Sequence, residues 1–533
     1  MMKGIYLFMT MCVAAIAFTA CTNELEESTV PADNALVLTV DGFPAFQETT
    51  ETRAVGTFDP GKTEWTSGDK VLVRVSSNGS TTQYATLTYE NNTWTTNPTL
   101  TRPESAFTVE AWYAPAYSWS NNELSSTTPG TGEFLHIEQT GLSDRNVTIN
   151  FSSVTRDYSR LRIVCSSGTN LSVSLTNFTP AGGDTAPSSY ALTTDDKGNA
   201  YLYGTWTGSS NLDVTYGSQS LVNKDNITAS VANTSYVVDA SFATNFPNAS
   251  TYDQIGSGTA NCPYILLNGT QFKDFANNGA KSAQYKMAAD IDLSTYTDWT
   301  PISDNFTGTF DGNDYAIKNL TRTTFASNFR FGLFNQNTGV IKNLQIEDCN
   351  IVNNENTASY AAAIADQNSG TIENCHIISG PIRATYVAGI ARVNTGNIIA
   401  CSNSASLTIN NGNNRCAGIC YENNGSIIAS YNIGKLNSTN IGYGIFNLSM
   451  TGSPITTISC FTTEGTLYGS VLSSHNAANC YYMNNNTITD QSGGTVTDWQ
   501  AAIENMNSTL QQGGYNYRYE MGDNNLPVIK STN

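Results

Sequence analysis

Charged side chains are scarce in this chain. Its 25 lysines and arginines and its 44 aspartates and glutamates make up 13% of the 533 residues, about half the share that is usual in a globular protein. The formal net charge is −19. Because so acidic a chain cannot neutralise phosphates or anionic lipid headgroups, we expect neither nucleic acid nor a charged membrane surface among its partners.

Histidine is rarer still. The three histidines, His136, His376 and His475, lie far apart in the sequence, which argues against metal centres and against nucleophiles that depend on an imidazole base. Nine of the 11 cysteines lie well beyond the N-terminus, an odd number without a Cys-x-x-Cys pair. We therefore expect no metal, no cofactor and free thiols in a core, with a disulfide between Cys416 and Cys420 as the alternative.

No apolar run is long enough to span a bilayer. The longest, residues 5–18, follows Lys3 and gives way to small and then polar residues, as in a signal peptide. The Phe-Thr-Ala sequence before Cys21 resembles a bacterial lipobox, and the acidic residues after it resemble surface-export signals of lipoproteins. The resemblance implies a leader over residues 1–20, palmitate on Cys21 and a surface-exposed lipoprotein of the cell outer membrane, held there only by lipid. The alternative is an ordinary secretory signal.

In place of charge, the chain is rich in uncharged polar residues. It contains 60 asparagines, 26 of them between positions 301 and 450. Such a composition favours turns and strands over helices, so we expect an all-β fold. From residue 35 to about residue 242, apolar and polar residues alternate in short bursts, for example at Leu36, Leu38 and Val40. This alternation predicts one or two β-sandwich modules.

Three segments of this first half carry a family resemblance. They read T-R-A at residues 52–54, W-T-S-G-D-K-V-L-V at residues 65–73 and A-T-L-T-Y-E-N-N-T-W at residues 85–94. Together with the lipobox they resemble the fimbrillin family, the subunits of protease-assembled (type V) pili. The resemblance covers residues 21–242.

The fimbrillin resemblance implies how the chain is processed. It implies a lipidated prosegment over residues 21–53, cleavage between Arg53 and Ala54, and a β-sandwich region over residues 54–242. Cleavage removes the first strand, residues 34–40, and opens a groove that a strand from another pilus subunit fills by β-augmentation. The alternative is that Arg53 is an ordinary loop arginine.

Beyond residue 244 the sequence becomes a repeat. Four segments share one frame that runs from a small residue to a glycine seven positions later, namely residues 332–339, 363–370, 389–396 and 418–425. The closing glycines are 31, 26 and 29 residues apart, so the loops vary while the frame is kept. Two positions after each glycine stands an isoleucine (Ile341, Ile372, Ile398, Ile427), and five positions after it stand Leu344, Cys375, Cys401 and Ser430. An offset of two and then three places a corner between two inward positions, which predicts the stacked coils of a parallel β-helix.

The segment that leads into these coils, residues 290–320, resembles the opening of β-helical surface domains with GLUG-type repeats. The resemblance implies a β-helix over residues 261–533, after a linker over residues 243–260. Because a β-helix needs its ends covered, we expect residues 285–293 to cover one end. At the other we expect a helical C-terminal cap over residues 498–510, with Trp499, Ile503, Met506 and Leu510 on one face, and a final strand at residues 526–529.

Three aspartates are the candidate catalytic residues. Asp290, Asp292 and Asp311 could supply the two carboxyl groups of a glycan-cleaving site or hold Ca²⁺. The alternative that we favour is that they cap turns of the first coil, so we predict no catalytic residues. A further short motif, Asp-Thr-Ala at residues 184–186, resembles an acceptor for bacterial O-glycosylation.

These features predict a fimbrial tip or accessory subunit that mediates adhesion through its C-terminal β-helix and is not an enzyme. The expected partners are other pilus subunits, joined by β-strand exchange, and host or bacterial glycans or proteins. A polar solenoid face rich in Asn, Thr and Tyr suits such binding. The alternatives are a surface-tethered polysaccharide-binding or polysaccharide-degrading β-helix protein, and an inert stalk.

Overall fold

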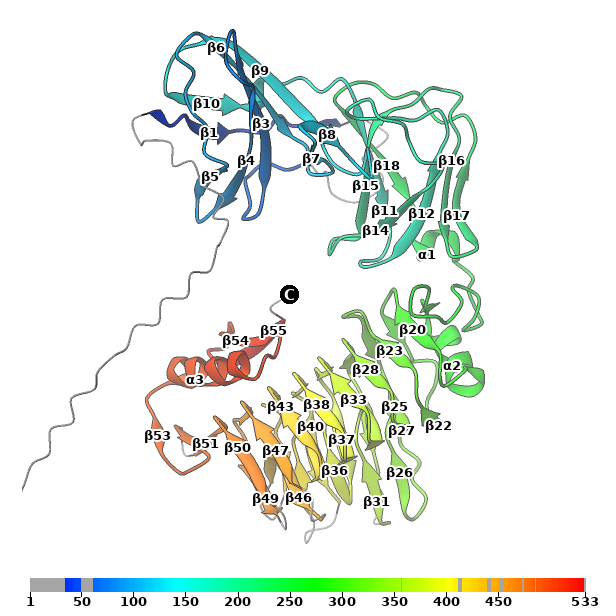
Figure 1. The fold of residues 1–533 in the computed structure, drawn as a ribbon. Helices are drawn as coiled ribbons and strands as arrows, with labels where there is room; N and C mark the ends of the chain where they lie inside the picture. The colour runs from blue at the N-terminus through cyan, green and yellow to red at the C-terminus, as the bar shows by residue number, and fades with distance from the viewer. Residues whose placement is uncertain are drawn as a thin grey trace, which may run out of the picture. The chain divides into compact units, whose positions relative to one another are not determined.

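The computed structural model describes residues 34–48, 61–355, 357–410, 415–438, 442–450, 454–471, 474–484 and 486–531. These residues are mostly strands, and they divide into two compact units (Figure 1). The first unit comprises residues 34–45, 61–127 and 133–155, and the second comprises the remainder. The predicted all-β class is confirmed.

The first unit is a β-sandwich module. One layer is an antiparallel sheet in the order β5 (Thr93–Asn97), β4 (Gln83–Glu90), β3 (Lys70–Ser77), β6 (Phe107–Tyr113) and β9 (Leu135–Leu142). The other layer is the parallel pair β1 (Val37–Asp41) and β10 (Asn146–Asn150), and a small hairpin joins β7 (Ser118–Ser120) to β8 (Glu123–Ser125). Leu36, Leu38 and Val40 are buried in the core with Val71 and Val73, as their alternation predicts.

The second unit begins with another sandwich module, so the first half of the chain contains two. One sheet has the order β13 (Thr179–Pro180), β15 (Asn199–Thr205), β11 (Ser159–Val164), β18 (Thr234–Asp239) and β2 (Gln47–Glu48). The facing sheet has the order β14 (Tyr190–Thr193), β12 (Asn170–Leu175), β16 (Leu212–Tyr216) and β17 (Gln219–Lys224). The short helix α1 (Phe242–Asn245) follows, and Phe242 packs into the core between these sheets.

The rest of the second unit is a parallel β-solenoid, as the repeat predicts (Figure 1). Four rows of strands run along it. The first row is β19 (Tyr264–Leu266), β20 (Gln284–Met287), β23 (Thr309–Asp311), β28 (Val340–Lys342), β33 (Thr371–Glu373), β38 (Asn397–Ile399), β43 (Ser426–Ile428), β47 (Ile455–Ile458) and β50 (His475–Ala478). The second is β21 (Ile291–Asp292), β24 (Ala316–Lys318), β29 (Gln345–Glu347), β34 (His376–Ile377), β39 (Ser402–Asn403), β44 (Tyr431–Asn432), β48 (Phe461–Thr462) and β51 (Tyr481–Asn484), to which β52 (Thr487–Asp490) and β53 (Thr495–Val496) add antiparallel strands.

The third row bends within each coil and so has two strands per coil in its middle part. Its order is β22 (Ile302–Phe306), β27 (Phe334–Asn337), β32 (Ala365–Asn368), β37 (Ala391–Asn394), β42 (Cys420–Asn423), β46 (Tyr443–Ser449), β41 (Cys416–Ala417), β36 (Tyr386–Ala388), β31 (Ser359–Ala361) and β26 (Phe329–Phe331), and β49 (Thr466–Val471) pairs with β46. The fourth row is β25 (Thr321–Arg322), β30 (Asn350–Val352), β35 (Pro381–Ala384), β40 (Ser406–Ile409) and β45 (Leu436–Asn437).

The predicted isoleucine ladder is confirmed. Ile341, Ile372, Ile398 and Ile427 are paired in register on successive strands and have no exposed surface. The predicted corner follows each of them as a residue with positive φ, at Asn343, Asn374, Ala400 and Ala429. The inward positions after the corner, Leu344, Cys375, Cys401 and Ser430, are also buried.

Helix α2 (Gly269–Asn278) covers the first coil. Its Phe272 and Phe275 are fully buried, with ring centroids 5.4 Å from Trp299 and 5.6 Å from Phe310 respectively. The prediction that residues 285–293 cover this end is wrong, because they form β20 and β21, which pair with strands of the next coil. The helix replaces them because two aromatic rings on one face seal the coil without leaving backbone groups unpaired.

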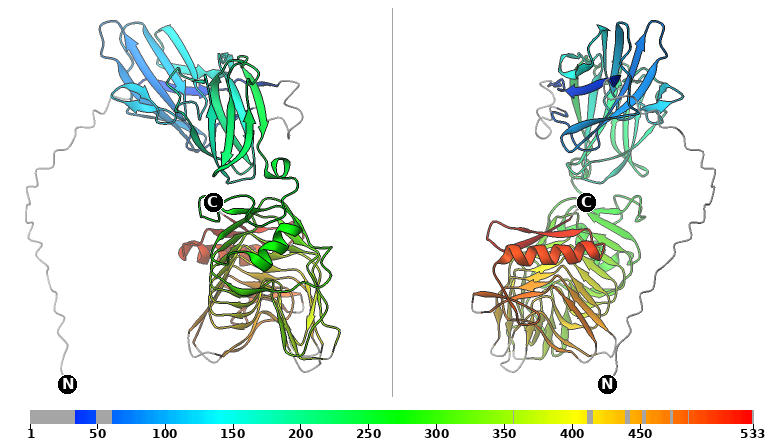
Figure 2. Two further views of the ribbon diagram at one scale, coloured as in Figure 1. Left: turned by 90° about the vertical axis from the view of Figure 1, so that its right-hand side faces the viewer. Right: turned by 60° about the vertical axis from the view of Figure 1, so that its left-hand side comes forward.

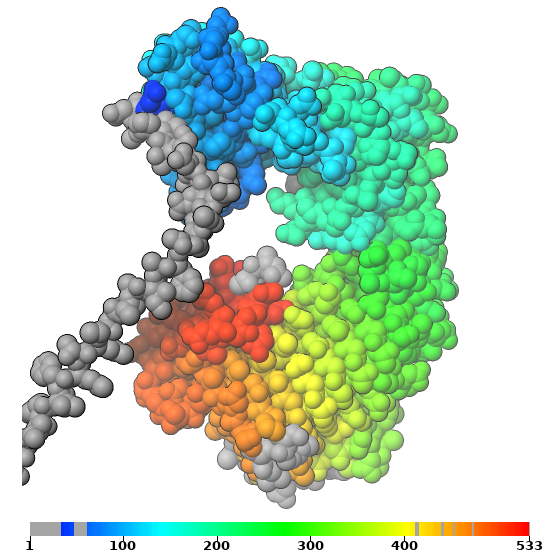
Figure 3. Space-filling view, viewed as in Figure 1, coloured from blue at the N-terminus to red at the C-terminus, as the bar shows by residue number. Residues whose placement is uncertain are grey.

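The C-terminal helix α3 (Trp499–Gln512) is confirmed, with Asp498 as its N-cap and the four predicted apolar residues buried. Its apolar face packs against outward side chains of the later coils, including Tyr431, Phe461 and Tyr481. The last two strands, β54 (Tyr517–Met521) and β55 (Pro527–Ser531), form a hairpin beside it, and Figures 2 and 3 show these C-terminal residues in red against the coils. The predicted final strand, residues 526–529, overlaps β55 from residue 527, and β54 is an addition that no pattern indicated.

Ile398→Asp should destabilise the chain by about 3 to 5 kcal/mol, because it places an uncompensated charge in the solenoid core. The neighbouring Asn397 is exposed and lies on the same strand, so Asn397→Asp is the matched control and should cost little. Thermal unfolding followed by circular dichroism measures both variants. Equal stability of the two would mean that the register is wrong.

Candidate functional site

The three candidate catalytic aspartates bind backbone amides and neighbouring side chains. Asp290 accepts a hydrogen bond from the amide of Ala316 (2.9 Å), and Lys318 Nζ lies 2.9 Å from its other oxygen. Asp292 is bonded by Asn319 Nδ2 (2.8 Å) and by the Ser294 amide (2.9 Å). Asp311 accepts from the Asn313 amide (2.9 Å) and from Asn343 Nδ2 (3.0 Å). These are the contacts of carboxylates that hold turns together.

The electrostatics of Asp290 and Asp292 do not suit general acid catalysis. Partial burial acts to raise the pKa of Asp290, but the Ala316 amide and Lys318 outweigh it and hold the pKa below its ordinary value. The hydrogen bond from Asn319 and those from Ser294 lower the pKa of Asp292. A glycosidase acid needs a raised pKa instead. The arrangement therefore favours the turn-capping interpretation of Asp290 and Asp292.

Cys21, Arg53 and Ala54 lie outside the described residues. The strand that precedes Arg53 does form, as β1, and residues 47 and 48 of the following stretch pair with β18 as β2. In the second sandwich module, the Asp-Thr-Ala motif at residues 184–186 lines an open pocket of about 590 Å³. Thr185 is exposed there.

The nine described cysteines are free thiols, and eight of them are buried. Cys375 and Cys401 stack at one position of successive coils, as the repeat predicts, and burial holds the pKa of Cys375 well above its usual range. Such thiols remain protonated and unreactive at neutral pH. Within the described ranges, His, Cys, Asp and Glu form no group of three that could hold a metal ion.

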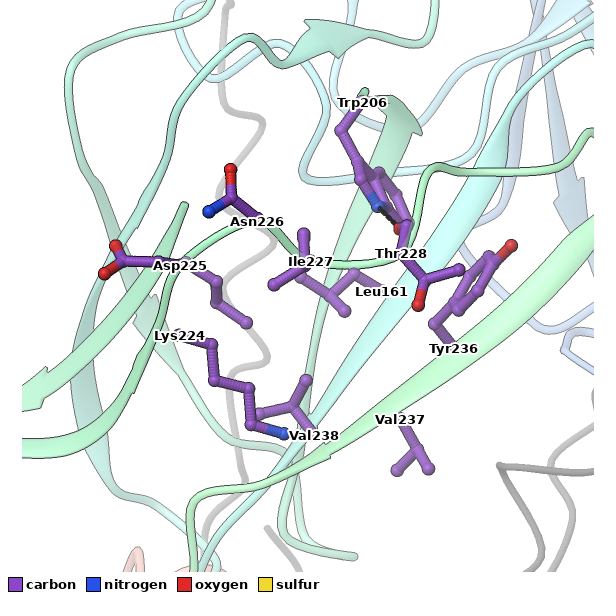
Figure 4. Close-up of a pocket in the computed structure, with 11 residues that line it drawn as sticks. Leu161, Trp206, Lys224, Asp225, Asn226, Ile227, Thr228, Tyr236, Val237 and Val238 are labelled. Carbon is purple, nitrogen blue, oxygen red and sulfur yellow. Dashed lines mark hydrogen bonds between the residues drawn. The ribbon is translucent and has the colours of Figure 1, made fainter. Parts of the chain in front are cut away.

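A pocket of about 370 Å³ opens in the second sandwich module between strands β17 and β18 (Figure 4). Its lining includes the apolar side chains of Leu161, Leu212, Ile227 and Val238. Among the described residues, β17 pairs only with β16, and β2 covers β18 only at residues 234 and 235. Strand edges without a full partner among the described residues, beside an apolar floor, are what β-augmentation requires.

A cluster of arginines and tyrosines lies around the bend of the third row of the solenoid. We call it the Arg–Tyr face, and it consists of Arg330, Tyr360, Tyr386, Arg392, Arg415 and Tyr421. Arg330, Tyr360 and Tyr386 are paired in register on β26, β31 and β36, and Arg415 precedes β41, the next strand of this row. Arg330 and Arg415 are exposed, and the three tyrosines are partly exposed.

The side chains of the Arg–Tyr face contact one another. The rings of Tyr360 and Tyr386 stack with centroids 4.7 Å apart and planes 11° apart, and Tyr421 meets Tyr386 edge-on at 5.3 Å. The guanidinium carbons of Arg330 and Arg392 lie 5.6 Å and 5.3 Å from the Tyr360 ring centroid. Burial raises the pKa of Tyr421 to about 12, so its hydroxyl stays protonated. The cluster is an ordered set of hydrogen-bond donors on a rigid wall.

Glycines at the bend bring successive coils close together. An added Cβ at Gly389 would lie 2.3 Å from the Gly418 carbonyl oxygen, and one at Gly418 would lie 2.1 Å from that of Gly444. Only glycine permits so close an approach between coils. The bend in turn lets Arg392, on β37, reach the ring of Tyr360, on β31.

The alignment of Arg330 with Arg415 in one row was not predicted from the sequence, although a pattern in the sequence indicates it. Tyr360, Tyr386 and Arg415 each stand ten residues before a closing glycine, and Arg330 stands nine before the first. A second missed set stands two residues before each closing glycine: Asn337, Asn368, Asn394 and Asn423. Their amides form a buried ladder with Nδ2 to Oδ1 distances of 2.8, 2.7 and 2.8 Å.

Arg392 is held by a buried ion pair with Asp366, in which Nη2 donates to Oδ2 at 3.0 Å. Asp366→Asn should destabilise the chain by about 3 to 5 kcal/mol, because it leaves a buried guanidinium without its counter-charge. The double change Asp366→Leu with Arg392→Met should cost less than the single one, since it removes both charges. Thermal unfolding compares the two, and a larger loss in the double variant would contradict this account of the pair.

Among the described residues, none of the helices combines the length and the apolarity that crossing a bilayer requires. No family model matches the chain. It is 28% identical over 127 residues to a candidate Gly-rich membrane protein of Evansella cellulosilytica, covering 22% of this chain and 14% of that protein. It is 33% identical over 111 residues to halomucin of Haloquadratum walsbyi, covering 19% and 1%. The chain thus spans only a small part of the relatives it matches.

Three solved structures resemble 39% of the chain. They are a candidate cell adhesion protein of Bacteroides fragilis (9% identity, 92% of that chain, TM-score 0.23), another of Bacteroides ovatus (14%, 91%, 0.24), and the shaft pilin SpaA of Lactobacillus rhamnosus (13%, 97%, 0.17). Likenesses with TM-scores this low carry no weight of their own, so the fold rests on the strand pairing described above.

Proposed function

We propose that this chain is a cell-surface adhesion protein, a lipoprotein anchored at Cys21 whose solenoid is the ligand-binding module. In this proposal it serves as a tip or accessory subunit of a fimbria. The Arg–Tyr face carries the proposal, because it places exposed guanidinium groups and partly exposed phenol groups in line on stacked coils. A repeating wall of this kind suits an extended partner.

Binding is a better account of the solenoid than cleavage. The aspartates that could act on a glycan are engaged in turns, and the pKa values of Asp290 and Asp292 are lowered. The Arg–Tyr face has two carboxylates nearby, and neither stands free. Asp366 is paired with Arg392, and Glu422 Oε1 accepts a hydrogen bond from Asn424 (2.8 Å).

Assembly by strand exchange is the second part of the proposal. Strand β1 is joined to the first module by its pairing with β10 and by three buried side chains, each worth about 1.5 to 3 kcal/mol. Cleavage after Arg53 would leave β1 held only by noncovalent contacts, these together with the pairing of β2 with β18 in the same segment, so that a strand from a neighbour could replace it. Among the described residues, the pocket at the edges of β17 and β18 offers a separate apolar site for an incoming strand.

Cys21→Ser should move the protein from the membrane fraction to the medium and abolish the attachment of producing cells to coated surfaces. The reason is that the lipid is the only proposed anchor. Cys262→Ser, at a partly exposed thiol, is the control and should change neither. Fractionation, labelling with a palmitate analogue and a cell-attachment assay measure the effects. Attachment that persists after the protein has left the surface would overturn the adhesion proposal.

Limited trypsin treatment of the full chain should release a fragment that begins at Ala54 before other sites are cut, and Arg53→Ala should prevent this. Lys62→Ala, at the next trypsin site along the chain, is the control and should leave the cut unchanged. A labelled peptide of residues 34–45 should then enter the nicked protein and not the intact one. Uptake by both, or by neither, would rule out activation by cleavage.

A further inference from the structure

We propose that the Arg–Tyr face binds a linear polysaccharide that carries carboxylates, a polyuronate, with the polymer lying along the solenoid axis. This inference rests on the adhesion function proposed above and names the class of its ligand. Three features of the face support it: the spacing of its groups, its unneutralised charge and its free hydroxyls.

The spacing suits a polymer. Arg330, Tyr360, Tyr386 and Arg415 occupy successive coils of one row, and neighbouring strands lie about 4.8 Å apart. The two arginines are therefore about 14 Å apart, three strand spacings, with two phenols between them. A chain of sugars along this line meets a guanidinium at each end and hydroxyl groups in the middle.

The charge of this row differs from that of two other rows of the solenoid. In those rows the sign alternates from coil to coil, as in Asp311, Lys342 and Glu373 on β23, β28 and β33, and in Asp292, Lys318 and Glu347 on β21, β24 and β29. Each cation there has an acidic neighbour, with Lys342 3.4 Å from Asp311 and Lys318 3.2 Å from Glu347.

Arg330 and Arg415 are separated by two neutral tyrosines instead. Within the part of the chain that the structure describes, neither forms an ion pair, and their guanidinium carbons lie over the rings of Tyr360 (5.6 Å) and Tyr443 (5.8 Å) respectively. Each guanidinium keeps donors free in a planar fork, whose best complement is a carboxylate. Although the chain has a net charge of −19, two such arginines in one row form a local site of positive charge, and such a site favours an anionic ligand.

The tyrosines indicate a hydroxyl-rich ligand. Because Tyr360 and Tyr386 stack on one another, one face of each ring is covered, and their hydroxyls remain for a partner. Neither hydroxyl has a hydrogen-bond partner among the described residues. A phenol can donate to a sugar hydroxyl and accept from one. Two arginines are too few to neutralise a nucleic acid, so the ligand is better sought among acidic glycans.

Affinity electrophoresis of the full chain tests the proposal with three polymers: polygalacturonate, its fully methyl-esterified form and dextran. We expect retardation by polygalacturonate and by neither of the others, because the ester keeps the backbone and removes the charge. Added salt should weaken the retardation, since exposed charges are screened over about 8 Å at physiological ionic strength.

Matched variants locate the site. Arg330→Gln with Arg415→Gln should weaken binding at least tenfold, and Tyr386→Phe, which removes one hydroxyl, should weaken it severalfold. Arg518→Gln changes an arginine whose side chain is 57% exposed in the C-terminal hairpin and should have no effect. Circular dichroism checks that each variant is folded, and Tyr386→Phe provides a test even if the double variant is unstable.

Three outcomes would overturn the inference: no binding to polygalacturonate, equal binding to its ester, or equal loss in the Arg518 control. If cells that display the chain still attach to surfaces in those cases, the ligand class is wrong while the adhesion function stands. If attachment is lost when the protein leaves the surface and the double variant also loses polygalacturonate binding, both proposals are supported.

Discussion

Each coil of the solenoid must place a compatible side chain at the position that its neighbours occupy, because in-register parallel stacking brings equivalent residues about 4.8 Å apart. The buried asparagines meet this requirement along their row, where each amide donates to the next. Removed from the row, such an amide would lose its partner and cost about 1 to 3 kcal/mol. The same constraint accounts for the scarcity of charge, since like charges that face each other on adjacent strands repel. Where charges do occur, as at Asp311, Lys342 and Glu373, their signs alternate.

The corner that follows each isoleucine shows how local conformation and packing compete. Asn343 and Asn374 occupy it with φ of 53° and 50°, a region that asparagine tolerates. At Ala400 and Ala429 the same conformation is held by alanine, at 55° and 51°. Both alanines are fully buried, and Ala429 belongs to the cluster that α3 covers. Under a helix, a buried amide without a partner would cost more than the strain of an alanine. The next corner residue, Ser459, keeps a polar group there because its hydroxyl donates to the Met506 carbonyl oxygen at 3.0 Å.

The Arg–Tyr face differs from the rows in which positive and negative side chains alternate. Its neutral tyrosines separate Arg330 from Arg415, so the two positive charges do not face each other on adjacent strands and need no counter-charge. Of the three arginines of this face, only Arg392 is buried, and Asp366 forms an ion pair with it. A solenoid can therefore carry unneutralised charge where aromatic spacers separate it, and that charge remains available to a partner.

Much of the fold followed from patterns that repeat in the sequence. The frame that ends in glycine determined the isoleucine ladder, the corner and the stacked thiols at Cys375 and Cys401, because a side chain's inward or outward direction is fixed by its position in a coil. The face of α3 followed from the spacing of Trp499, Ile503, Met506 and Leu510 for the same reason. The site was largely beyond such reasoning. The cover formed by Phe272 and Phe275, the reach of Arg392 across the bend to Tyr360 and the pocket between β17 and β18 depend on residues that are distant in sequence or on edges left without a neighbour. Periodicity determines which side of its own coil a residue faces, whereas the tertiary structure alone decides what lies opposite it, because loops of different length set how the coils align.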